Sequence, residues 1–290
     1  MMLTTPNPLE GTVIDARPTT ADRVRQVGVT LAEVACVFGT LVGTGVIGRR
    51  VAESSGGSLS SAATHIAPAG PAFSIWSMIY LGLFAYTVWQ WLPGQAAAPR
   101  HRAVGRLVAA SMLLNAGWLL VTQVDWIAFS VLVIVAMLAV LVAAVARLLR
   151  HPASGNVDAV ITDGTLGAYL GWVCVATCAN VAAALAAYRV RPGAPVADAL
   201  AVVVVAVAAL VGVALTRWVG AMSTAARWSI GLAVAWGLAW IAVGRTSGDP
   251  RSIPTAVAAG LGTLAVLTAT ATAGRRTARG RADADTDAHA

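Results

Sequence analysis

Long apolar runs separated by short polar segments fill the chain between residues 27 and 273. A helix needs about 20 mostly apolar residues to cross the hydrocarbon core of a bilayer. We expect eight membrane-spanning helices, at residues 27–48, 71–92, 104–123, 126–147, 165–188, 198–216, 226–244 and 253–273. Only Val124 and Asp125 separate the third run from the fourth, which predicts a tight helical hairpin. The pattern predicts an all-α, polytopic transmembrane helical bundle.

The two ends of the chain lack such runs. Residues 1–26 are polar, contain prolines and glycines, and precede a span too long for the apolar core of a signal peptide. We expect them to form an uncleaved, disordered N-terminal tail. Residues 274–290 are first basic and then acidic, which predicts a disordered C-terminal tail.

The fifth run carries a polar and aromatic stripe. At 100° per residue, Tyr169, Trp172, Ala176 and Asn180 fall on one narrow side of a helix. Packing against a neighbouring helix would explain this stripe, and so would a cavity inside the bundle.

Two other runs show the same arrangement. Phe73, Trp76 and Tyr80 share one side of the second helix, and Asn115 and Trp118 share a face of the third. An amide inside the membrane needs a partner, because an unpaired polar group in hydrocarbon costs several kcal/mol. Asn115 therefore either bonds to another helix or faces an internal cavity.

Composition and charge agree with a membrane protein. The chain is 58% hydrophobic and 11% charged, and its mean hydropathy is +0.74. All 20 basic residues are arginines; with eight spans, 14 lie on the side of both termini and 6 on the other. The positive-inside rule then predicts that both termini lie in the cytoplasm, and we expect a multi-pass protein of the cell membrane. Because the arginines flank the apolar runs, the net charge of +7 does not indicate nucleic-acid binding.

The apolar runs contain few groups that carry chemistry. Coupled transporters place ionisable residues in their spans, and these spans contain almost none. No nucleophile, acid–base pair or metal set converges, so we expect no enzyme.

Asp163 is expected to satisfy free amides at the start of the fifth helix. Gly39 and Gly43 form a GxxxG pattern, which indicates close packing of two helices or a homodimer.

Three segments together resemble the tryptophan-rich sensory protein or translocator protein family (TspO/MBR), a five-helix membrane fold. The family's second helix is matched by Pro71, Phe73, Trp76, Tyr80, Ala85, Tyr86 and Trp89. Its Leu-Asn-x-x-Trp motif in the third helix is matched by Leu114, Asn115 and Trp118. Its fifth-helix motif is matched by Ala168, Tyr169, Trp172, Ala176 and Asn180, with Ala168 in place of a proline.

The resemblance implies a five-helix domain at residues 27–188, followed by three additional helices at 198–273. It implies a pocket capped by the loop between the first two helices, which binds a porphyrin or another tetrapyrrole, or a sterol-like molecule. The ligand-binding residues would be Trp76, Tyr80, Asn115, Trp118, Tyr169, Trp172, Ala176 and Asn180. The implied function is that of a sensor or receptor; a passive transporter and a membrane scaffold are the alternatives.

The first loop departs from the family pattern. It lacks the usual Trp-Tyr pair and Lys-Pro, and reads RRVAESSGGSLSSAATHIAPAGP. His65 is its only imidazole, either a ligand for haem-type iron or a solvated side chain. Trp236 and Trp240, four residues apart in the seventh run, either extend a binding face or pack between helices.

Overall fold

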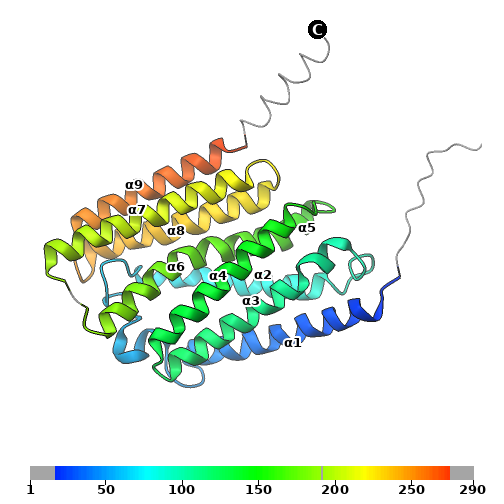
Figure 1. Cartoon of the computed structure of the whole chain (residues 1–290), viewed down its shortest axis with the longest axis horizontal. Helices are drawn as coiled ribbons and strands as arrows, with labels where there is room; N and C mark the ends of the chain where they lie inside the picture. The colour runs from blue at the N-terminus through cyan, green and yellow to red at the C-terminus, as the bar shows by residue number, and fades with distance from the viewer. Residues whose placement is uncertain (1–16, 191, 275–290) are drawn as a thin grey trace, which may run out of the picture.

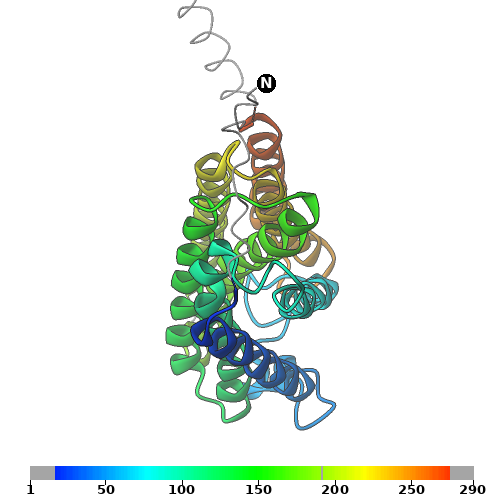
Figure 2. The ribbon, with the colours of Figure 1, turned by 90° about the vertical axis from the view of Figure 1, so that its right-hand side faces the viewer.

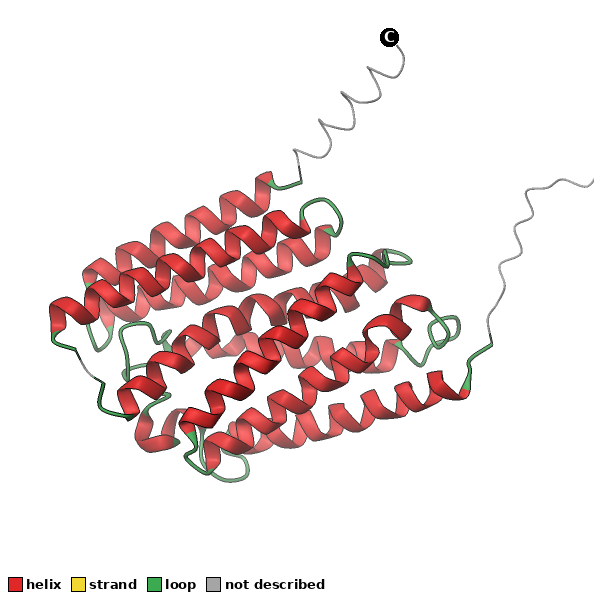
Figure 3. Ribbon diagram, viewed as in Figure 1, coloured by secondary structure: helices red, strands yellow, loops and turns green. Residues whose placement is uncertain are grey.

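The computed structural model describes residues 17–190 and 192–274, and all regular structure in these ranges is helical (Figure 3). Eight helices are long and apolar enough to cross a membrane, which confirms the predicted all-α transmembrane bundle. They are α1 (Thr20–Gly43), α2 (Ile75–Trp89), α3 (Pro99–Gln123), α4 (Ile127–Leu148), α6 (Thr165–Ala187), α7 (Ala194–Val219), α8 (Thr224–Ser247) and α9 (Ile253–Thr272).

The helices run side by side in two layers. In Figure 1, α7, α8 and α9 lie together next to α6, and α1 lies at the far side beside α3. Figure 2, turned by 90°, shows α4 on one side of the bundle and α2 on the other. The start of α1 and the end of α9 lie at the same end of the bundle, as an even number of spans requires.

Two helices begin earlier than the apolar runs indicate. α1 starts at Thr20 because Thr19 and Asp22 form a capping box, in which each side chain bonds to the other residue's amide. The prediction of a disordered tail is therefore wrong for residues 20–26; residues 1–16 and 275–290 lie outside the described residues. α6 is extended at its start by α5 (Asn156–Asp158) and a π-helical segment, Ala159–Gly164.

The GxxxG pair packs inside the chain. A Cβ atom on Gly39 would lie 2.9 Å from the Cα atom of Ala116, and one on Gly43 would lie 2.4 Å from the Leu119 side chain. Both glycines thus let α1 approach α3 closely. This face is covered within the monomer, so a homodimer, which remains a prediction, would need another face.

The last three helices pack closely on the fifth span. A Cβ atom on Gly171 of α6 would lie 2.6 Å from the carbonyl oxygen of Ile230 on α8, and one on Gly167 would lie 2.9 Å from that of Ala226. Such an approach is possible only without a side chain. The three C-terminal helices therefore form one packed body with the first five.

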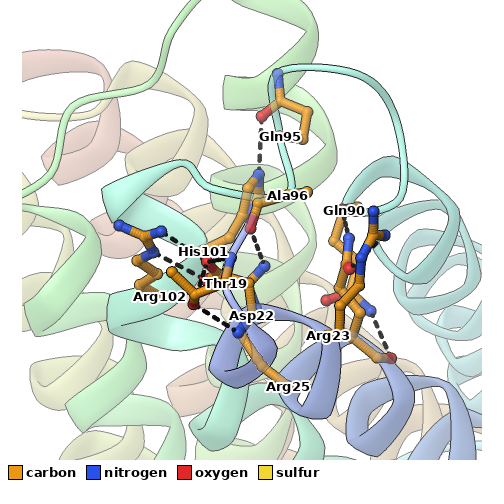
Figure 4. A network of polar contacts seen from close by, with 10 residues as sticks. Thr19, Asp22, Arg23, Arg25, Gln90, Gln95, Ala96, His101 and Arg102 are labelled. Carbon is orange, nitrogen blue, oxygen red and sulfur yellow. Dashed lines mark hydrogen bonds and ion pairs between the residues drawn. The ribbon is translucent and has the colours of Figure 1, made fainter. Parts of the chain in front are cut away.

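A polar network ties the start of α1 to α3 (Figure 4). The Arg102 guanidinium donates two hydrogen bonds, of 2.8 and 2.6 Å, to the Asp22 carboxylate. Arg25 donates to the carbonyl oxygen of Ala96 (2.7 Å), and Gln95 lies 3.0 Å from a ring nitrogen of His101. These contacts fix the end of the bundle at which α1 begins.

Candidate functional site

The ring-bearing sides of α2, α3 and α6 meet around one cavity of about 60 Å³. α4 closes a further side, and the loop between α1 and α2, residues 44–69, lies across the end. The cavity is lined by Val51, Ser58, Leu59, Ser60, Thr64, Ala67, Pro68, Phe73, Trp76, Trp118, Ile134, Met137, Trp172, Ala176, Ala179, Asn180 and Ala183.

Aromatic rings form much of its wall. The Trp76 ring is perpendicular to that of Trp172, with centroids 6.2 Å apart, and Phe73 meets the edge of Trp172 at 5.9 Å. Tyr80 stacks on Trp76 at 5.3 Å, with 17° between the ring planes. Perpendicular and offset rings are the favourable arrangements for aromatic pairs, so the wall is held in a defined shape.

Five of the eight residues predicted for ligand binding line the cavity: Trp76, Trp118, Trp172, Ala176 and Asn180. The other three, Tyr80, Asn115 and Tyr169, lie outside its lining and support the wall from behind. Asn115 Nδ2 donates to the Tyr80 hydroxyl oxygen (3.1 Å), and the Tyr169 hydroxyl donates to the carbonyl oxygen of Ser111 (3.2 Å). Sequence spacing places a residue on a helix face, but it does not distinguish residues that line the cavity from residues that support the wall behind them.

Asn180 fixes the orientation of one wall residue. Its Oδ1 accepts a 2.7 Å hydrogen bond from the Trp118 indole nitrogen, and its Nδ2 donates to Ser130 Oγ on α4 at 2.9 Å. The amide thus links α3, α4 and α6 inside the membrane, where such a group must be paired.

The indole nitrogen of Trp172, unlike that of Trp118, is unpaired in the part of the chain that the structure describes. Trp172 is 1% exposed, yet its indole nitrogen has no hydrogen-bond partner among the described residues. A buried donor is almost always paired. Trp172 therefore combines a ring that lines the cavity with an indole N–H that is buried and unpaired among the described residues.

One end of the α1–α2 loop is tied to the α3–α4 turn. Asp125 Oδ1 accepts a 2.6 Å hydrogen bond from the amide of Ser55, and its carboxylate lies 3.2 Å from the Arg49 guanidinium. The Ser55 amide and then the Arg49 side chain hold the pKa of the Asp125 carboxyl below its usual value. The carboxylate stays ionised near neutral pH, which keeps this contact in place.

The other end of the loop is held by α8. Arg245, 1% exposed, donates from Nη1 and Nη2 to the carbonyl oxygens of Thr64 and Ser61, both at 2.8 Å. The same nitrogens donate to the carbonyl oxygens of Pro250 and Asp249, in the α8–α9 loop, at 3.0 and 3.1 Å. One guanidinium thus joins the cover of the cavity to the C-terminal helices.

Further contacts from α7 and α8 reach this loop and the short 3-10 helix that follows it, Gly70–Ser74. Trp236 Nε1 donates to the carbonyl oxygen of Ala72 (2.9 Å), and the Trp240 carbonyl oxygen accepts from the amide of Ala69 (3.1 Å). Neither tryptophan lines the cavity: Trp240 packs against the core, whereas Trp236 is 38% exposed. His65 Nε2 lies 3.5 Å from the Asp198 carboxylate of α7. In the described ranges no group of three or more His, Cys, Asp and Glu residues could hold a metal ion.

A second cavity of about 310 Å³ lies at the other end of α3 and is lined by Arg100, Arg150, His151, Ser154 and Asp158, among others. Arg100 is buried, pairs with Asp158 (3.3 Å) and Asp163, and donates to the carbonyl oxygen of His151.

The structure corrects the role predicted for Asp163. This residue lies in the π-helical segment, pairs with Arg100 and accepts a 2.7 Å hydrogen bond from Ser223. It does not cap free amides at a helix start, because the helix begins earlier, at Asn156. Its partners come from α3 and the α7–α8 turn, which are too far away along the chain for a sequence pattern to indicate them.

A family model described as TSPO-like protein matches residues 30–271. The match begins within α1 and ends within α9, so it includes α7, α8 and α9 as well as the first five spans, three of which carry the tryptophan motifs. No curated protein and no solved structure matches the chain. With the family model covering most of the chain, and with eight helices able to span a bilayer, this multi-pass membrane protein belongs to the TSPO-like protein family.

Proposed function

We propose that the protein is a membrane sensor or receptor that binds a planar or apolar small molecule, of the tetrapyrrole or sterol-like class, in the aromatic cavity. The observation that carries this proposal is Trp172, a buried wall residue whose indole N–H is unpaired among the described residues. Ligand pockets are mostly apolar and contain a few polar groups that fix orientation. The rings of Trp76 and Trp172 supply the apolar faces, and the indole N–H supplies a donor.

The size of the cavity sets a condition on binding. Its volume of about 60 Å³ is well below the roughly 300–1,000 Å³ of ligand pockets for drug-sized molecules. Four walls are membrane helices, and the remaining wall is the α1–α2 loop. We infer that a tetrapyrrole enters when this loop moves outward, which makes the loop the gate of the proposed site.

Filling the cavity from within tests the proposal. Ala176 lines it, and Ala176→Leu adds an isopropyl group to the space a ligand would take. We expect protoporphyrin to bind the purified full chain and the variant to bind about tenfold to 100-fold more weakly, because overpacking costs about 1–3 kcal/mol. The measurement is the shift of the porphyrin absorption band during titration in nanodiscs.

The matched control is Ala187→Leu, an exposed site near the end of the same helix, which should leave binding unchanged. Equal affinity of all three proteins would place the ligand elsewhere. A sterol titrated in competition distinguishes the two ligand classes.

A further inference from the structure

Glu33 is a carboxyl group inside the first membrane span, and the sequence pattern gave it no role. It lies within α1 and is 6% exposed. Its Oε2 has no hydrogen-bond partner, and it takes part in none of the ion pairs found among the described residues. An ionisable side chain inside a membrane helix is costly, and such residues mark functional sites in most cases.

Among the residues that the structure describes, none with a positive charge pairs with Glu33. On α1, Arg25 lies eight residues earlier, about 12 Å along the axis. α2 and α3 are the helices packed against α1. α2 offers Tyr80 and Tyr86 but no charged residue, and α3 has none from Leu107 to its end. An unpaired carboxylate would remain costly here, so a bound proton is the simplest means of neutralising it.

Glu33 lies one helical turn from Cys36, which contacts the Asn115 amide that supports the cavity wall. Cys36 follows it by three residues on the buried face of α1. Asn115 Nδ2 lies 3.5 Å from Cys36 Sγ and donates to the Tyr80 hydroxyl at 3.1 Å. Tyr80 in turn stacks on Trp76, which lines the cavity.

We propose that Glu33 is a proton-binding site within the membrane span, and that its protonation is linked to the aromatic cavity through Asn115, Tyr80 and Trp76. Glu33 does not line the aromatic cavity. A proton can bind at Glu33 without a cavity, whereas a larger ligand would need one. A carboxylate formed at Glu33 would attract the Asn115 amide, which now holds Tyr80. Because linkage is reciprocal, a change in the cavity wall also changes the proton occupancy of Glu33.

The proton-binding site can be tested without any cavity ligand. Dicyclohexylcarbodiimide enters lipid and reacts with protonated carboxyl groups. The acid proton moves to a carbodiimide nitrogen, the carboxyl oxygen bonds to the central carbon, and an acyl shift gives a stable N-acylurea. In nanodiscs of the full chain, we expect the adduct on Glu33 and its absence in Glu33→Gln. Its yield should fall about tenfold per pH unit above the half-labelling pH, as measured by peptide mass spectrometry.

Glu53, exposed in the α1–α2 loop, is the internal control and should react far less. For the linkage, Asn115→Ala and Tyr80→Phe should shift the half-labelling pH of Glu33. Thr122→Val should not, because the Thr122 hydroxyl donates to the Leu119 carbonyl oxygen of its own helix and to no other described residue. The absence of an adduct, or a yield independent of pH, overturns the proton-binding site. An unchanged half-labelling pH in both Asn115→Ala and Tyr80→Phe overturns the linkage. Neither result depends on the proposed cavity ligand.

Discussion

Replacing Arg245 with alanine is expected to release the loop that covers the aromatic cavity. The buried guanidinium donates one hydrogen bond to each of two carbonyl oxygens of this loop, at Ser61 and Thr64. A hydrogen bond from a charged donor contributes about 1.5–3 kcal/mol, so losing both should ease opening by at least about 3 kcal/mol, or roughly 100-fold. The readout is the rate at which a polar thiol reagent labels Ser60→Cys, a cavity-lining position of the loop.

Two further variants test whether the faster labelling is caused by the loss of the Arg245 hydrogen bonds. Arg251→Ala removes an exposed arginine from the nearby α8–α9 loop and should leave the labelling rate unchanged. Arg245→Lys retains the charge but not the planar fork that reaches both loops, so it should give an intermediate rate. If Ser60→Cys stays as protected in folded Arg245→Ala as in the parent protein, α8 does not hold the gate.

The variant Arg100→Ala should cause the largest loss of stability. Arg100, Asp158 and Asp163 are all buried, and removing the arginine leaves two carboxylates without their cation. Breaking a buried ion pair by removing one partner costs about 3–5 kcal/mol. We expect a decrease of this size in the free energy of unfolding, measured by denaturant titration in mixed micelles.

A charge-neutral variant separates electrostatics from packing. Arg100→Leu combined with Asp158→Asn and Asp163→Asn removes all three charges and should recover much of the lost stability. Arg106→Ala, on the exposed side of the same helix, is the matched control. If Arg100→Ala unfolds at the same denaturant concentration as Arg106→Ala, the buried network does not stabilise the bundle.

The bundle and its aromatic centre were predictable because both follow from periodicity. A long apolar run is needed to cross lipid, so eight runs predicted eight helices. Trp172, Ala176 and Asn180 fall on one side of any α-helix, wherever its neighbours are. That this side meets Trp76 and Trp118 at one cavity agrees with the three motifs occurring on separate helices.

The contacts that hold the cavity closed could not be predicted in the same way. Arg245 was counted only as a charge at a membrane surface, yet its four acceptors lie in two loops, one of them far away in the sequence. Asp163 likewise bonds to residues from distant segments. The start of α1, in contrast, had a local signal, Thr19 and Asp22, that the apolar pattern concealed.

Tryptophan-fluorescence titration tests the central claim, that a planar ligand binds between the rings of α2, α3 and α6. We expect saturable quenching by protoporphyrin. Trp76→Phe and Trp172→Phe should each weaken binding about threefold to tenfold, because a well-placed aromatic contact contributes about 0.5–1.5 kcal/mol. Trp126→Phe, an exposed ring at the start of α4, should bind as the parent protein does. Saturable quenching with the same affinity in Trp76→Phe, Trp172→Phe and Trp126→Phe would contradict the account.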